Sequence, residues 1–220
     1  MFMKWVYRLE RKHGNLCIHN LMMVIVLGQL LVYLADQLTP AIALSNRLML
    51  YWPAVMSGEV WRVLTFVFVP GNMSVLMLAV TLYCNYLIGH GLESTWGDFR
   101  FNVYYLFGMV GAVLSSALFG VGTSTYLNLS LFFAFAMLYP DMQFLFFFIL
   151  PIKAKYLGMI SGGICLLQFV FGPWYIKGSI LFSLLNFLLF FGEDFFRMAR
   201  QEIRYAKNRR AWRNNGNNWR

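Results

Sequence analysis

Long apolar runs separated by short polar stretches make up most of the sequence. A helix needs about 20 predominantly apolar residues to cross a hydrocarbon core of about 30 Å. We interpret six runs as membrane-spanning helices: residues 21–38, 74–88, 101–119, 123–139, 154–171 and 177–191. The last run covers about 15 residues, or about 22 Å at 1.5 Å per residue, so we expect thinned or tilted lipid around it. The pattern predicts an all-α membrane protein with one six-helix domain over residues 21–192.

Two other apolar stretches do not fit the spanning pattern. Residues 39–59 are too apolar to lie in water, and we expect them to form an interfacial loop on the outer face. From this loop, residues 63–70 lead the chain into the bilayer. Residues 142–152 are apolar over only 11 positions and two lysines follow them, which predicts a shallow interfacial or re-entrant piece. Turns are expected at residues 89–100 on the inner face and at residues 120–122 on the outer face.

The composition supports the membrane interpretation. Of 220 residues, 60% are hydrophobic and only 12% are charged, whereas a soluble domain has about 45–50% and about 25%. The net charge of +9 comes largely from the two ends of the chain, so it does not indicate nucleic-acid binding. Basic residues favour the cytoplasmic side. We therefore expect residues 1–20 and the flexible tail, 193–220, to be cytoplasmic, with the tail binding anionic lipid and the chain lying in a bacterial cytoplasmic membrane.

Small residues predict where helices approach one another closely. They recur every four positions in the third run and in GxxxG spacing in the fifth, at Gly108, Ala112, Ser116, Gly158 and Gly162. The cysteines show no such order. Cys17, Cys84 and Cys165 lack CxxC spacing, so we expect buried apolar thiols, no metal site and no cofactor.

One short motif lies between the first two runs, where Trp61-Arg62 follows Glu59. An arginine at the depth of the hydrocarbon must be matched by carbonyls or by a carboxylate, because unpaired charge there is expensive. Glu59 is three residues away and is the expected carboxylate. The pair alone is weak evidence, since Trp and Arg are ordinary interfacial anchors.

Three elements together resemble the rhomboid superfamily. They are the Trp-Arg pair, which derlins share; a G-x-x-L-E-x-x-W-G-x-x-R-F stretch carrying Gly89, Glu93, Gly97 and Arg100; and Tyr139-Pro140-Asp141 leading to Pro151-Ile152-Lys153-Ala154-Lys155. The resemblance covers about residues 21–192. It implies a six-helix rhomboid-like bundle whose first outer loop is embedded in the outer leaflet. In active members, an intramembrane serine protease site lies below that face.

The catalytic positions implied by the resemblance are degenerate. The family's GxSG turn falls on residues 123–126, with Thr125 at the nucleophile position, Ser124 beside it and no glycine. Ser179 or a near neighbour stands where the family's sixth helix has its histidine. The oxyanion positions fall on Met77 and Thr81, and methionine donates no hydrogen bond. A serine without an adjacent base is a poor nucleophile, so the chain resembles a rhomboid pseudoprotease.

Two functions remain open at this point. The first is a catalytically inactive, derlin-like membrane protein that binds transmembrane segments of client proteins in quality control or trafficking. The alternative is a rhomboid-family intramembrane serine peptidase with a non-standard site that uses Ser124 or Thr125. A transporter or channel has no support, because no acidic residue lies deep within a predicted span.

Overall fold

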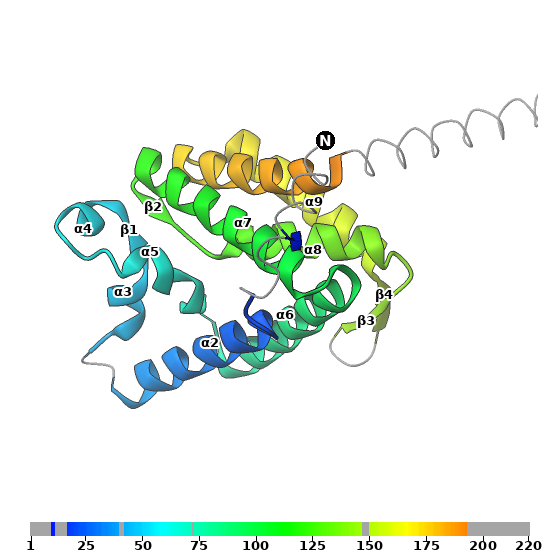
Figure 1. Cartoon of the computed structure of the whole chain (residues 1–220), viewed down its shortest axis with the longest axis horizontal. Coiled ribbons are helices and arrows are strands. Elements are labelled where there is room, and N and C mark those ends of the chain that lie inside the picture. The colour runs from blue at the N-terminus through cyan, green and yellow to red at the C-terminus, as the bar shows by residue number, and fades with distance from the viewer. Residues whose placement is uncertain (1–9, 12–16, 40–41, 72, 147–149, 193–220) are drawn as a thin grey trace, which may run out of the picture.

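The computed structural model describes residues 10–11, 17–39, 42–71, 73–146 and 150–192 (Figure 1). The predictions about the basic tail, 193–220, and about most of residues 1–20 lie outside these ranges. The helices and strands follow in chain order: α2 (Leu21–Leu38), α3 (Leu44–Leu48), β1 (Leu50–Tyr51), α4 (Trp52–Met56), α5 (Arg62–Thr65), η1 (Phe66–Phe68), α6 (Val75–Trp96), α7 (Asp98–Phe119), β2 (Val121–Gly122), α8 (Thr125–Leu138), β3 (Gln143–Phe146), β4 (Leu150–Lys153), α9 (Ala154–Phe171) and a last helix, Trp174–Gly192.

Five helices in the described part of the chain are long and apolar enough to cross a membrane: α2, α6, α7, α9 and Trp174–Gly192. This confirms the prediction of a largely helical protein with several helices that could span a membrane, and it suggests an integral membrane protein. The remaining predicted span, the fourth in chain order, is α8, which has only 14 residues, or about 21 Å at 1.5 Å per residue. It ends one residue before Tyr139 because Pro140 disfavours a helical conformation in the residue before it.

The length of the last helix was predicted wrongly. The sequence suggested about 15 residues for the sixth span, but the helix covers 19 described residues, Trp174–Gly192. The helix begins before the predicted start at Lys177 and also includes Trp174, Tyr175 and Ile176. This is possible because Pro173 is compatible with the start of a helix. The short helix in this bundle is therefore α8, the fourth of the six predicted spans.

The predicted inner turn over residues 89–100 is also wrong in its extent. Helix α6 continues through Gly89 to Trp96, and α7 starts at Asp98. Gly97 alone separates them, with φ at 84°, a value that strains residues with a Cβ. Gly89 has a packing role, because a Cβ there would lie 2.1 Å from Cγ of Met22 on α2. The glycine therefore lets α2 and α6 approach closely.

Two small antiparallel sheets correct the all-α prediction. Strand β1 pairs with β2, and Trp52 N–H donates to Gly120 O at 2.8 Å, so the first loop is joined to the connection between α7 and α8. The expected interfacial or re-entrant piece after α8 forms the β3–β4 hairpin. Its sequence is rich in Phe, Leu and Ile and is too short for a spanning helix. Figure 1 shows α3–α5 at one end of the molecule and the β3–β4 hairpin at the other.

Helices α6, α7 and α8 enclose most of the core. Phe101, Tyr104 and Tyr105 of α7 and Phe135 of α8 are almost completely buried. In contrast, α9 lies at the periphery, and only Ala154 and Cys165 are buried among its residues. The three cysteines also differ: Cys165 is buried, whereas Cys17 and Cys84 are only half-buried. The expectation of three buried thiols is therefore wrong for two of them.

The small residues divide into packed and open positions. A Cβ on Gly108 would lie 3.0 Å from Asn186 and 3.2 Å from Leu127, and a Cβ on Gly158 would lie 3.2 Å from Ala136. These glycines face neighbouring helices. Ser116 is completely buried on the same side of α7. By contrast, a Cβ on Gly162 meets no atom of the described residues within 4 Å.

Candidate functional site

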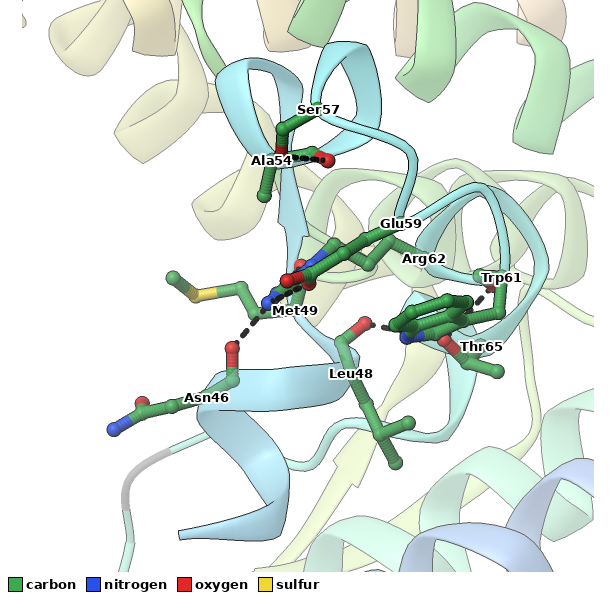
Figure 2. Close-up of polar contacts among 9 residues, drawn as sticks. All are labelled: Asn46, Leu48, Met49, Ala54, Ser57, Glu59, Trp61, Arg62 and Thr65. Carbon is green, nitrogen blue, oxygen red and sulfur yellow. Dashed lines mark hydrogen bonds and ion pairs between the residues drawn. The ribbon is translucent and has the colours of Figure 1, made fainter.

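The guanidinium of Arg62 organises the loop between α2 and α6 (Figure 2). Its Nε donates to Glu59 Oε2 at 2.5 Å, and one terminal nitrogen donates to the carbonyls of Asn46 and Met49, each at 2.8 Å. The other terminal nitrogen lies 2.5 Å from the same Glu59 oxygen. Arg62 is only 8% exposed. The expected match by a carboxylate and by carbonyls is present.

The carbonyls that bind Arg62 come from the C-terminal end of α3. The last carbonyls of a helix have no partner within it and carry the negative end of the helix dipole. In this short helix they are satisfied by Arg62 and by Thr65, whose Oγ1 lies 3.3 Å from Leu48 O. The cationic side chain thus ties α3 to α5 across 13 to 16 residues of chain.

The same turn carries an apolar outer surface. Trp61 is 53% exposed, and its indole lies on the side of Thr65, away from the atoms that bind the guanidinium (Figure 2). Val60 and Leu64 are exposed beside it. A loop whose charge is satisfied inside and whose surface is apolar is suited to an interfacial position.

The residues that the resemblance assigns to catalytic positions do not form a single cluster. Thr125 is exposed at the start of α8, and Ser124 Oγ lies 3.5 Å from the carbonyl of Val69, its hydrogen-bond acceptor. Met77 is 53% exposed on α6, and Thr81 lies one turn further along that helix. Neither α6 residue lines the cavity that contains Ser179.

That cavity lies between α7, α8 and the last helix. Its volume is about 10 Å³, which is room for about one water molecule. Its lining is rich in hydroxyl groups and small residues: Gly108, Ala112, Thr123, Tyr126, Leu127, Ser130, Ser179 and Ser183. None of these residues carries an imidazole, an amine or a carboxylate, so the lining supplies no general base.

The hydroxyls of the cavity are engaged with structural partners. Ser179 Oγ lies 3.1 Å from Ser115 Oγ and donates to Tyr175 O at 3.0 Å. Ser183 Oγ donates to Tyr126 O at 2.5 Å. The contacts of Ser179 with Ser115 and of Ser183 with Tyr126 join the last helix to α7 and α8.

The two described histidines lie elsewhere. His90 stacks on Tyr86 with ring centroids 5.7 Å apart, and His19 contacts Asp98; His13 lies outside the described residues. The Nζ atom of Lys177 lies 5.1 Å from the centre of the Trp174 ring. This cation–π contact accounts for its position at the mouth of the last helix.

The motif at the α6–α7 junction holds the N-terminal segment. Glu93 is buried and accepts a hydrogen bond from Leu21 N–H at 2.9 Å. Arg100 Nε donates to Glu10 Oε2 at 2.9 Å. Sequence reasoning missed a third anchor, Asn102 of α7, and a cluster formed by Cys17, His19 and Asp98. No periodic signal reveals either of them, because the partners lie about 80 residues apart.

An ion pair closes the β3–β4 hairpin. Lys153 Nζ donates to Asp141 Oδ1 at 2.8 Å. This hydrogen bond and the lysine charge lower the pKa of the Asp141 carboxyl below its ordinary value of 3.8 and raise the pKa of Lys153. The contribution of Asp141 to stability is therefore complete above its unfolded-state pKa and is lost as pH falls through the lower folded-state value.

Replacing Lys153 with methionine tests this assignment. The pKa of the Asp141 carboxyl should rise toward 3.8 in the variant, because both the hydrogen bond and the charge are removed. NMR titration of the side-chain carboxyl measures the shift directly. Lys155→Met is the control with the smaller expected effect, since its charge is the weaker cause. An Asp141 pKa that Lys153→Met leaves unchanged would contradict the assignment.

Comparison with known proteins identifies no relative. No protein-family model matches the chain, and neither a curated protein nor a solved structure is significantly similar to it.

Proposed function

We propose that this chain is a catalytically inactive, rhomboid-like integral membrane protein that binds transmembrane segments of client proteins in quality control or trafficking. The observation that carries the proposal is the pairing of Ser179 and Ser183 with Ser115 and with the carbonyl of Tyr126. Near the place where the resemblance calls for a base, hydroxyls bind the last helix to α7 and α8. The resemblance also calls for the loop that contains Arg62, and in this loop the Arg62 guanidinium is hydrogen-bonded to a carboxylate and to two carbonyls.

The peripheral helix α9 offers the surface for a client. Gly162 and Gly163 lie on it, and a Cβ on either meets no atom of the described residues within 4 Å. Met159 and Leu166 flank them at helical spacing and are exposed. Small residues allow a second helix backbone to approach closely, which favours association in a membrane, where apolar burial gives little drive.

The short helix α8 supports the same function. Helix α8 is about 21 Å long, whereas the hydrocarbon core is about 30 Å thick. Thinned lipid, helix tilt or neighbouring residues must compensate for this difference in length. Each of these responses costs a fraction of a kcal/mol per Å of mismatch. Helix α8 packs against α9, so lipid thinned beside it would also lower the cost for a client helix to approach α9.

Site-specific photocrosslinking in membranes tests the client surface. A photoreactive amino acid at Met159 or Leu166 should give adducts with membrane proteins, and the peptides recovered by mass spectrometry should come from transmembrane segments. Leu31 of α2, which is equally exposed, is the control position. Gly162→Leu should reduce the adducts from Leu166 because its side chain fills the approach surface.

Two outcomes would contradict the client surface. The first is the same set of adducts, at the same yield, from Leu31 and from Leu166. The second is a yield from Leu166 that Gly162→Leu does not change.

The alternative, a peptidase that uses Ser124 or Thr125, makes a separate prediction. A fluorophosphonate probe labels a serine only when a base activates it. We expect no labelling of the purified protein, because the acceptor for the Ser124 hydroxyl is a backbone carbonyl. Labelling that disappears in Ser124→Ala or Thr125→Ala, but persists in Ser94→Ala, would establish the peptidase instead.

A further inference from the structure

Three side chains of different chemistry converge where the N-terminal segment meets the α6–α7 junction. The thiol of Cys17, the imidazole of His19 and the carboxylate of Asp98 place one ligand atom each within 4.8 Å of one another. We propose that these residues bind a divalent transition-metal ion of the Zn²⁺ class. This inference is independent of the proposed function.

The ligand types define the class of metal. A thiolate, an imidazole and a carboxylate are the donors found in zinc sites, at distances of about 2.0–2.3 Å from the ion. The thiolate disfavours Mg²⁺ and Ca²⁺, which prefer oxygen ligands. A thiolate and a carboxylate together also balance the double positive charge. Tetrahedral coordination places ligand atoms about 3.4 Å apart, which the observed cluster reaches with small side-chain movements.

Buried side chains hold the ligands in place. Asn102 is 7% exposed, and its amide nitrogen donates to Ile18 O at 2.9 Å and to Asp98 O at 2.7 Å. Ile18 lies between Cys17 and His19, so one amide group fixes the ligand loop to the start of α7. The second anchor is the bond from Leu21 N–H to Glu93. Such supporting contacts orient metal ligands and raise affinity.

The metal would replace a direct contact. In the structure His19 Nδ1 contacts Asp98 Oδ2, and an ion placed among the three ligands would separate these atoms and bind both. The His19 side chain is 77% exposed, which leaves the fourth coordination position open to water. Glu93 Oε1 accepts the hydrogen bond from Leu21 N–H, and Glu93 is not among the three residues whose ligand atoms cluster.

Cobalt titration of the full-length protein tests the site. The protein is purified in detergent without a histidine tag, treated with chelator and titrated with Co²⁺, which reports a thiolate ligand by its charge-transfer absorption. We expect one equivalent to bind, with the absorption of a tetrahedral site, and Zn²⁺ to displace it. Cys17→Ser should remove the charge-transfer absorption, and Asp98→Asn should weaken binding by about tenfold or more. Cys84→Ser and Cys165→Ser, both distant thiols, should change neither.

A second measurement needs no variant. Zn²⁺ should protect Cys17 of the native protein from alkylation, as measured by mass spectrometry of its peptide, while the modification of half-buried Cys84 stays unchanged. Equal alkylation of Cys17 with and without Zn²⁺ would overturn the proposal. So would a cobalt spectrum without thiolate absorption, or one that Cys17→Ser leaves intact, because in either result Cys17 is not a metal ligand.

Discussion

Replacing Arg62 with alanine should lower the free energy of unfolding by about 3–6 kcal/mol, because its hydrogen bonds to the carbonyls of Asn46 and Met49 are lost and each bond from a charged donor contributes about 1.5–3 kcal/mol. The variant leaves Glu59 and the carbonyls of Asn46 and Met49 without the group that binds them. It also releases the C-terminal end of α3 from α5. Reversible unfolding in mixed micelles, followed by far-UV circular dichroism, measures the loss.

Two milder variants show which of the contacts matters. Arg62→Lys keeps the charge but loses the planar guanidinium that reaches a carboxylate and two carbonyls together. It should lower the free energy of unfolding, but by less than Arg62→Ala does. Glu59→Gln should cost only about 1 kcal/mol, because the Glu59 side chain is 38% exposed. A loss for Glu59→Gln equal to that for Arg62→Ala would assign the stabilisation to the ion pair rather than to the helix carbonyls, contrary to our interpretation.

Adding one methyl group at Gly89 should destabilise the α2–α6 contact by about 1–3 kcal/mol, the range for overpacking a close-packed site. The new Cβ would lie 2.1 Å from Cγ and 2.5 Å from Cβ of Met22. Because the Cβ belongs to the rigid part of that side chain, rotation alone cannot relieve the clash and the helices must separate. The same unfolding assay applies.

Gly162→Ala is the matched control. It makes the same chemical change inside another apolar helix, α9, where the new Cβ meets no described atom within 4 Å. Alanine favours the helical conformation over glycine by about 0.5–1 kcal/mol, so this variant should be neutral or more stable. A stabilising effect of both substitutions would show that Gly89 does not set the distance between α2 and α6.

The elements that the sequence predicts best are those with uninterrupted apolar runs. Helices α2 and α9 begin and end at the predicted residues. Their apolar runs are bounded by polar residues or by a proline next to aromatic residues, so both ends can be recognised in the sequence. The α6–α7 junction was harder to predict. The stretch from Gly89 to Trp96 contains two glycines and several polar residues, which favour a turn locally, but packing of Gly89 on Met22 and Leu92 in the core keeps it helical.

The site was predictable only where its partners are close in sequence. Glu59 lies three residues before Arg62, so the ion pair could be expected from spacing. The carbonyls of Asn46 and Met49 could not, because any backbone carbonyl looks the same in a sequence and only the end of α3 leaves these two available. The cluster of Cys17, His19 and Asp98 is invisible for a related reason: it requires the contact between residue 18 and Asn102.

The most direct test of the central claim is the mass of a client held at Leu166. If the proposed function holds, a client captured from membranes by the photoreactive residue at this position should be full-length, because the proposal is binding of its transmembrane segment and the lining of the cavity around Ser179 supplies no general base. A captured client that is truncated within its transmembrane segment, and is full-length again in Ser124→Ala or Thr125→Ala, would contradict the account and identify the chain as a peptidase.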